Sequence, residues 1–144
     1  MAARWTCAAN LTGQTTTNAT ILLDRQTVAS KVEIQEWEYQ VSGSSGTVQV
    51  IKLVRSSTTT TSTTPYALDP ATSGALSGFA TNLAYTAQGV SLLEVAHAAS
   101  ARGFWFIFQS DVYPTIYASS AQPSLAAHSA DAADLGMTLF IDEA

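Results

Sequence analysis

The chain has 144 residues, of which 47% are hydrophobic and 12% are charged, and its formal net charge is −5. This length and apolar content predict one folded domain, residues 1–144, with a proper core, and exclude a disordered chain. The charged fraction is well below the roughly 25% of typical soluble domains, which favours β-structure and protein–protein packing over a cytosolic metabolic enzyme.

Charge and cysteine content also narrow the possible partners. The six basic residues are scattered along an acidic chain, whereas phosphate binding requires clustered lysine and arginine. We therefore expect no nucleic-acid partner and no anionic membrane partner. Cys7 is the only cysteine, which excludes an intrachain disulfide and a multi-cysteine zinc site. No segment reaches the ~20 apolar residues of a membrane span, and residues 1–11 lack a signal-peptide core, so we expect synthesis in a cytosol without export.

The N-terminal third begins with two predicted strands. Residues 4–11 alternate loosely and fit an edge strand with Trp5 as the large anchor; residues 1–11 also fit an extended N-terminal arm, because chain ends can extend without disturbing a core. Residues 16–23 are rich in threonine and then apolar, which is typical of a strand.

The segment from residue 31 to residue 56 predicts a long central β-hairpin. Two strand-like runs flank the turn sequence Ser-Gly-Ser-Ser-Gly. The second run, residues 48–54, is apolar at both odd and even positions, which indicates a strand covered on both faces by a second sheet or by a neighbouring subunit.

The first run of this segment contains a break in its alternation. Val32 and Ile34 share one face, but Trp37 and Tyr39 fall on the opposite parity, which a regular strand cannot reconcile. A β-bulge near residues 35–36 would bring all four side chains to one face. Alternatively, the strand lies between two layers and is apolar on different sides in its two halves.

The next segments predict a loop and the one possible helix. Residues 56–64 form a serine- and threonine-rich tract without an apolar anchor, which favours a solvated loop. Residues 71–83 permit one short helix, because Leu76, Phe79 and Leu83 fall at positions i, i+3 and i+7.

The C-terminal part predicts further strands. They are residues 91–98, the aromatic run 104–109 as a central strand covered on both sides, the brief run 115–118, and the final run 135–142. Residues 119–134 between the last two are largely small and polar. About seven to nine short strands, at most one short helix and no βαβ rhythm predict an all-β antiparallel sandwich of the jelly-roll or immunoglobulin-like kind, and we expect the jelly-roll form.

The sequence offers no catalytic constellation. Glu94 and His97 lie three residues apart on a predicted strand and so point to opposite faces, and His128 has no partner motif. No G-x-S-x-G motif, phosphate loop or EF-hand pattern is present. Glu36, at the break in alternation, is expected to be partly buried and structural rather than a catalytic acid. We therefore expect no enzyme activity, no metal and no cofactor.

The central segment resembles a family of small structural proteins of tailed phages and prophages. The shared pattern is a strand with an apolar-apolar-Glu-apolar core, a glycine-containing turn, a strand ending in Leu-x-Arg, a Thr/Ser-rich loop and a Pro…Leu-Asp-Pro segment. The matching positions are Ile34, Glu36, Trp37, Gly46, Leu53, Arg55, Pro65, Leu68, Asp69 and Pro70. The likeness extends to the aromatic run 103–109 and to the terminal Phe140, Asp142 and Glu143. It departs from the family at residues 98–101, Ala-Ala-Ser-Ala, where a Trp/His-Pro-containing turn is usual.

This resemblance implies a jelly-roll virion component, a decoration (cement) protein on the outer capsid surface, made in the host cytoplasm. Its partner would be the major capsid protein, and it would form a homotrimer. We expect capsid contacts from the N-terminal segment, at Arg4, Trp5 and Leu11. We expect the oligomer interface on the two doubly apolar strands, at Val48, Val50, Val54, Phe104, Phe106 and Phe108.

An alternative function is a carbohydrate- or receptor-binding tip module of a head or tail fibre. Tyr66, Tyr113 and Tyr117 lie in or near predicted loops, and exposed aromatic rings among polar side chains can stack against sugars. Loop tyrosines more often anchor the loop itself.

Overall fold

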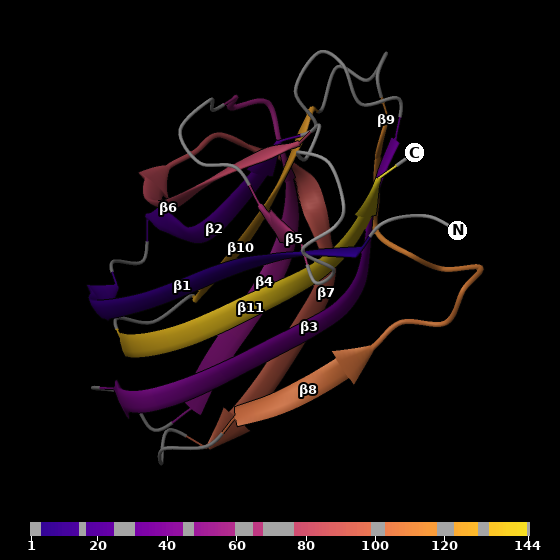
Figure 1. Cartoon of the computed structure of the whole chain (residues 1–144). Helices are drawn as coiled ribbons and strands as arrows, with labels where there is room; N and C mark the ends of the chain where they lie inside the picture. Colours follow the sequence, from indigo (N-terminus) through magenta and orange to yellow (C-terminus); the bar gives the residue numbers. More distant parts are fainter. Residues whose placement is uncertain are drawn as a thin grey trace.

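The computed structural model describes residues 4–14, 17–24, 31–44, 48–59, 65–67, 77–98, 103–117, 123–129 and 133–143. These residues form eleven β-strands (Figure 1). The strands are β1 (Arg4–Gln14), β2 (Asn18–Asp24), β3 (Lys31–Ser44), β4 (Val48–Ser56), β5 (Tyr66–Ala67), β6 (Gly78–Ala84), β7 (Ala87–Ala98), β8 (Gly103–Ile107), β9 (Thr115–Tyr117), β10 (Ser124–Ser129) and β11 (Ala133–Glu143). The described residues contain no helix long and apolar enough to cross a membrane.

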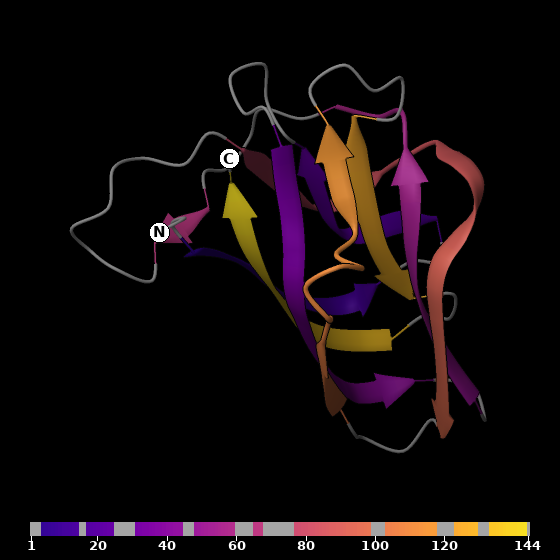
Figure 2. The same cartoon turned by 90° about the vertical axis from the view of Figure 1, so that its right-hand side faces the viewer.

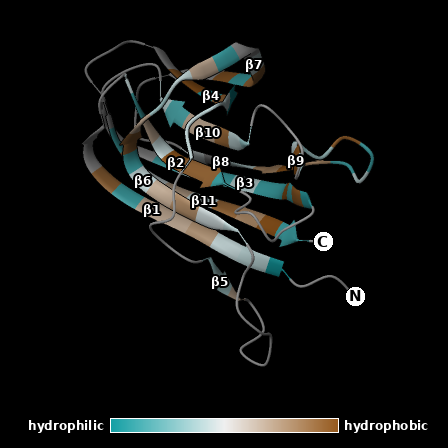
Figure 3. Cartoon of the chain, turned by 90° about the horizontal axis from the view of Figure 1, so that it is seen from above, coloured by the Kyte–Doolittle hydropathy of each residue, from teal (hydrophilic) through white to brown (hydrophobic). Residues whose placement is uncertain are grey.

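The strands form two antiparallel sheets. The first sheet has the order β5-β1-β11-β3-β8, and β9 also pairs with β3; the second has the order β6-β2-β10-β4-β7. Seen from above, β7, β4 and β10 lie in one layer and β3, β11 and β1 in the other (Figure 3). The predicted all-β antiparallel sandwich is confirmed.

Eight of the strands pair in a nested order that defines the jelly roll. β1 pairs with β11, β2 with β10, β3 with β8 and β4 with β7, all antiparallel. Successive pairs fall alternately in the first and second sheets, as when one long hairpin is rolled into two layers. β5 and β6 extend opposite sheets at their edges, and β9 continues the edge of the first sheet beyond β8.

The predicted central hairpin of residues 31–56 is wrong. β3 and β4 are consecutive in the chain, but β3 belongs to the first sheet and β4 to the second. Trp37 of β3 and Leu53 of β4 belong to the same buried cluster between the sheets. The two runs therefore face each other across the core, because each carries an apolar face that a side-by-side pairing alone would leave uncovered.

The predicted β-bulge in β3 is confirmed. Phe140 of β11 is opposite Glu36 and the next residue, Ile141, is opposite Ile34, so Gln35 is the additional residue. The bulge turns all the large apolar side chains of this part of β3 into the core: Val32, Ile34, Trp37 and Tyr39 are each at most 1% exposed.

The core lies between the two sheets and draws on both. Its buried members are Trp5, Cys7, Ile21, Leu23, Val32, Ile34, Trp37, Tyr39, Ile51, Leu53, Phe79, Ile116, Leu125, Ala127, Leu135, Met137, Leu139 and Ile141. Burial raises the pKa of the Cys7 thiol, and the nearby Glu143 carboxylate raises it further, so this cysteine is an unreactive core residue.

The predicted extended N-terminal arm is wrong for residues 4–11. Residues 4–11 form β1, which pairs with β11 from Arg4 to Leu11 and with β5 at its start. Trp5 is only 4% exposed, because its large side chain lies in the core. It cannot serve as a surface anchor, and deleting residues 1–11 would remove a strand. Residues 1–3 lie outside the described residues.

The helix expected over residues 71–83 is wrong where the structure describes it. Residues 78–84 form β6, paired with β2 so that Phe79 is opposite Leu23. Phe79 belongs to the core cluster, whereas Leu83 packs against the smaller cluster of Ala19, Leu22 and Ala126, so the strand does not bring these two side chains to the single face that a helix would give them. Residues 71–76 lie outside the described residues.

One central strand gave no signal in the sequence. β10 lies between β2 and β4 in the second sheet, and Leu125, Ala126 and Ala127 are fully buried. Its alanines and serines are also typical of loops. In β10 they fit a strand that is covered on both faces, because small side chains need little space.

Candidate functional site: the outer face of the first sheet

The bulge in β3 divides the edge of the first sheet into β8 and β9. Between them the chain leaves the sheet as a projecting connection, residues 108–114, drawn in orange in Figure 1 and facing the viewer in Figure 2. Its ends are fixed at the bulge: the Phe108 amide donates to the Gln35 carbonyl (3.0 Å), and the Ile34 amide donates to the Pro114 carbonyl (2.9 Å). We call residues 108–114 the β8–β9 excursion.

Large apolar side chains are exposed on this edge. The aromatic run was predicted to be a central strand covered on both sides, and this is wrong because β8 is at the edge of the first sheet and no described segment covers its outward side chains. Trp105 is 59% exposed and Ile107 is 67% exposed, and Val112 in the excursion is 60% exposed. Phe106 instead packs against the core.

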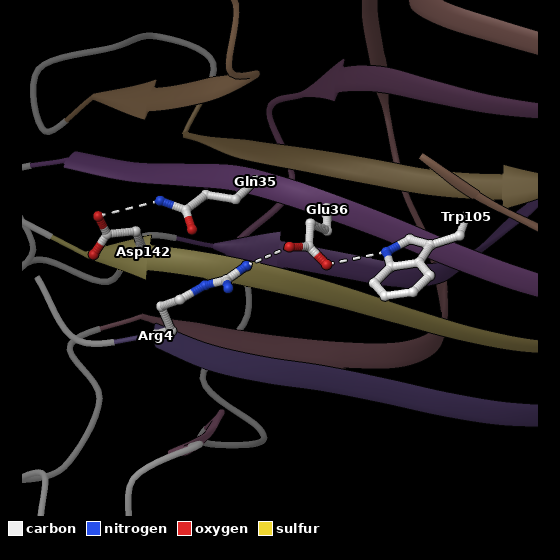
Figure 4. Close-up of polar contacts among 5 residues, drawn as sticks. All are labelled: Arg4, Gln35, Glu36, Trp105 and Asp142. Atoms are coloured by element: carbon white, nitrogen blue, oxygen red, sulfur yellow. Dashed lines mark hydrogen bonds and ion pairs between the residues drawn. The ribbon is translucent and has the colours of Figure 1, made fainter. Parts of the chain in front are cut away.

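Glu36 organises the outer face beside the bulge (Figure 4). Its carboxylate accepts a hydrogen bond from the Arg4 guanidinium at Oε1 (2.8 Å) and one from the Trp105 indole N–H at Oε2 (3.0 Å). The Trp105 ring lies 6.5 Å from the ring of Phe140, centroid to centroid, with the planes tilted by 30°. Glu36 therefore joins β1 and β8 across β11 and β3 and fixes the orientation of an exposed tryptophan. These contacts support the structural role that the sequence predicts for Glu36.

Further charged groups continue along the same face. Lys31 contacts Glu33 at 2.6 Å, and Gln35 donates to Asp142 Oδ2 at 3.4 Å. Partial burial raises the pKa of Asp142, and the Glu33 carboxylate raises it as well, while the backbone amide of Glu143 and the cations act in the opposite direction. The result is a mixed polar surface at the end of the sheet where β3 begins.

A shallow groove crosses the middle of this outer face. It has a volume of about 730 Å³. Its lining residues come from β1, β3 and β11 and are Ala8, Ala9, Asn10, Glu38, Tyr39, Gln40, Gly136, Met137 and Thr138. The floor is low because Gly136 has no side chain, and a Cβ added there would have no atom within 4 Å. The groove lies toward the beginning of β8, since Gln40 is opposite Gly103 and Glu38 is opposite Trp105.

Over β2 and β10, the outer face of the second sheet is covered by the chain itself. Leu22 and Ala126 are fully buried there, and Tyr85, from the connection between β6 and β7, packs against them. Thr86 fixes this connection through a backbone bond to Ser57 (3.2 Å) and a bond from its own amide to the Thr58 hydroxyl (2.9 Å).

Tyr85 also pairs with His128 on this face. The Tyr85 hydroxyl and His128 Nδ1 form a short hydrogen bond, and the two rings lie 5.3 Å apart. Burial lowers the pKa of His128, and the neighbouring Lys52 cation lowers it further. Burial raises the pKa of Tyr85. A neutral histidine that accepts at Nδ1 from a protonated tyrosine fits both shifts.

Of the residues expected at an oligomer interface, one is buried and three are half-buried within the protomer. Val54 is 4% exposed, opposite Ala126 on the closed face of the second sheet. Phe106 and Phe108 stack on each other at 5.9 Å and pack against the core. Val50 is half-buried on β4. The side chains of Val48 and Phe104 lie outside the described residues.

Among the capsid-contact candidates, only Arg4 offers a polar surface group, and its guanidinium is bound to Glu36. Leu11 is half-buried. The tyrosines expected near loops are placed on strands or beside them: Tyr66 and Tyr117 are 66% and 56% exposed, and Tyr113 is half-buried.

The residues that shape the open face are not among those predicted from the sequence. One signal for them exists, because Glu36, Glu38 and Gln40 alternate with Trp37 and Tyr39 and so define an outward polar row. Gly136 had no such signal. In the part of the chain that the structure describes, no group of three or more His, Cys, Asp or Glu side chains could hold a metal ion.

Comparisons with known proteins add little to this description. No protein-family model matches the sequence, and no curated protein matches it. Among solved structures, the chain is similar to one from a massively expanded particle of equine rhinitis A virus, a picornavirus capsid. The TM-score is 0.27 at 7% sequence identity, over 99% of this chain and 67% of that chain. This similarity is too low to establish a shared fold or function. The class of the protein, a jelly-roll domain, is defined by its own strand pairing.

Proposed function

We propose that this chain is a structural protein of a tailed-phage virion that decorates the outer surface of the head. The proposal is supported by the sequence resemblance around Glu36 and by the jelly-roll pairing, an architecture common among viral capsid and lectin domains. The protein is made in the host cytoplasm and binds the major capsid protein at junctions between capsomers.

The observation that carries this proposal is the β8–β9 excursion. It presents Val112 and, at its base, Ile107, two large aliphatic side chains that are each at least 60% exposed. Exposed apolar groups on a projecting segment are typical of contact sites between proteins. Hydrogen bonds to Ile34 and Gln35 hold both ends of the excursion, so little conformational entropy is lost when it docks.

The proposed assembly is a homotrimer at a three-fold or quasi-three-fold position. Closed rotational symmetry would place three excursions on three neighbouring capsid subunits. Binding at several junctions at once multiplies weak individual contacts, and this avidity stabilises the shell.

Co-sedimentation with capsids assembled without this protein tests the proposal. The full chain is expected to sediment with the capsids, and the double variant Ile107→Ser, Val112→Ser is expected to stay in the supernatant. Leu92→Ser is the matched control, because Leu92 is an aliphatic residue 44% exposed on the edge strand of the other sheet. Native mass spectrometry of the same samples reports the oligomeric state.

The outcomes separate the parts of the proposal. A wild-type chain that does not sediment with the capsids overturns the decoration function. A double variant that sediments as well as wild type overturns the excursion as the contact, and a monomer both free and bound overturns the trimer.

A further inference from the structure

The outer face of the first sheet holds a second feature that the decoration function does not use. The groove over Gly136 lies near the beginning of β8, whereas the excursion leaves the sheet at the end of β8. Its volume of about 730 Å³ falls within the roughly 300–1,000 Å³ typical of small-ligand sites. The groove is therefore large enough for a ligand, and none of its lining residues belongs to the excursion.

Over β11 and β3, recognition in this groove must come from side chains. β11 and β3 each have neighbours on both sides, so their backbone amides and carbonyls are used in the sheet. A peptide that binds by adding a strand needs a free sheet edge, which the middle of this face does not provide.

The side chains that line the groove suit a ligand with many hydroxyl groups. Asn10 and Gln40 each carry an amide that donates and accepts, Thr138 carries a hydroxyl that does both, and Glu38 accepts. Planar amides and carboxylates can engage neighbouring hydroxyls in pairs. Glu38 is the charged side chain among the lining residues described, so the groove favours a neutral ligand over an anionic one.

Trp105 adds an aromatic surface beside this polar set. It is opposite Glu38 in the strand register, so the two side chains project from the same face. More than half of the tryptophan is exposed, and its indole N–H is bound to Glu36. The ring is thereby held in place before any ligand arrives, which reduces the entropy lost on binding. An exposed indole face is an apolar surface that can pack against the C–H face of a pyranose ring.

We infer that this groove binds a neutral oligosaccharide, with one sugar ring packed on Trp105 and its neighbours bonded by Asn10, Glu38 and Gln40. On a virion surface, such a site would attach the particle to neutral glycans of a cell envelope or its surroundings. The inference goes beyond the decoration function and does not depend on it, because it concerns the purified chain alone.

The test begins with a glycan array that carries neutral and sialylated oligosaccharides, probed with the full chain. The neutral glycan with the strongest signal is then titrated by calorimetry. Trp105→Ala is expected to weaken binding about tenfold or more, as truncation of an aromatic anchor does. Gly136→Leu is expected to abolish binding, because the new side chain fills the groove, and the space above Gly136 lets it do so without a clash.

Tyr66→Ala is the matched control. Tyr66 is a 66% exposed aromatic residue on β5, opposite Thr6 of β1 and away from the groove lining. Its removal is expected to leave the affinity unchanged.

Three results would overturn the inference. They are the absence of a signal from every neutral glycan, a preference for sialylated glycans, and unchanged affinity in both Trp105→Ala and Gly136→Leu. The circular dichroism spectrum of each variant shows that it is folded. Capsid co-sedimentation of Trp105→Ala separates the two proposals, since loss of glycan binding is expected without loss of capsid binding.

Discussion

The two sheets of this jelly roll differ in whether other parts of the chain cover their outer faces. On the second sheet, the connection between β6 and β7 lies across the strands, and Tyr85 covers the fully buried Leu22 and Ala126. On the first sheet no described segment covers the middle strands, and Trp105 and Ile107 are exposed on the adjacent edge strand β8. One sandwich therefore has a sealed side and an open side.

This contrast indicates that one outer face contributes mainly to stability and the other is available for binding. Side chains on the sealed face behave as a second, smaller core, so their contribution is to the free energy of unfolding. Side chains on the open face are fixed by one another, as Glu36 fixes Trp105, yet they bury little area. Such groups contribute little to stability and remain available to a partner.

Removing the cover from the sealed face should have the largest effect. Tyr85→Ala loses the packing against Leu22 and Ala126 and leaves His128 Nδ1 without its hydroxyl partner. We expect the free energy of unfolding to fall by about 3 kcal/mol. Urea denaturation followed by circular dichroism measures the change.

The open face supplies the control for this measurement. Tyr66→Ala removes a side chain that is 66% exposed, and surface substitutions of this kind usually change stability by about 0.5 kcal/mol or less. Equal losses in the two variants would show that the second sheet is not sealed by Tyr85.

The sequence was sufficient to predict the architecture because the alternation of apolar residues is a local signal. The break between Ile34 and Trp37 indicated a bulge near residues 35–36 as one of two solutions, and the pairing of β3 with β11 confirms it. What alternation does not encode is which strand pairs with which. The expected hairpin of residues 31–56 failed for that reason, and β10 was missed because Ala126 and Ala127 carry no strong pattern.

The candidate site was harder to predict because it depends on exposure. Five consecutive large residues, from Phe104 to Phe108, indicate burial on both sides, yet β8 is an edge strand and Trp105 and Ile107 on its outward side are exposed among the described residues. The groove depends on Gly136 being next to Asn10 and Gln40, three residues brought together only by the pairing of β1, β11 and β3. No spacing in the sequence reports that juxtaposition.

The two faces should also respond to pH with opposite signs. The pKa of His128 is lowered by folding, so the unfolded chain binds the proton more readily. Its contribution to stability is present above about pH 6.5 and is lost as pH falls from there through the lower folded value. The pKa of Asp142 is raised by folding, so its contribution is present below about pH 3.9 and lost as pH rises through the folded value.

Urea denaturation across this pH range, for wild type, His128→Gln and Asp142→Asn, measures both contributions. Between neutral and mildly acidic pH, His128→Gln is expected to lose less stability than wild type. An identical pH profile for wild type and His128→Gln would contradict the sealed environment of this histidine. Asp142→Asn keeps this site neutral at every pH, so it is expected to behave like wild type below about pH 3.9 and to be the more stable protein once pH rises above the folded pKa of Asp142.

The smallest effect on stability is expected from Glu36, although its effect on the open face is large. Glu36→Ala removes a partly exposed ion pair with Arg4, which costs about 0.5 kcal/mol. The same change removes the acceptor of the Trp105 indole N–H and should release the ring.

Acrylamide quenching of fluorescence reports this ring selectively, because Trp5 and Trp37 are at most 4% exposed. We expect stronger quenching and lower anisotropy of the accessible tryptophan in Glu36→Ala, and loss of the quenchable component in Trp105→Phe. If Glu36→Ala instead destabilised the fold as much as Tyr85→Ala, Glu36 would be part of the structural framework, and the contrast between a sealed and an open face would fail at its centre.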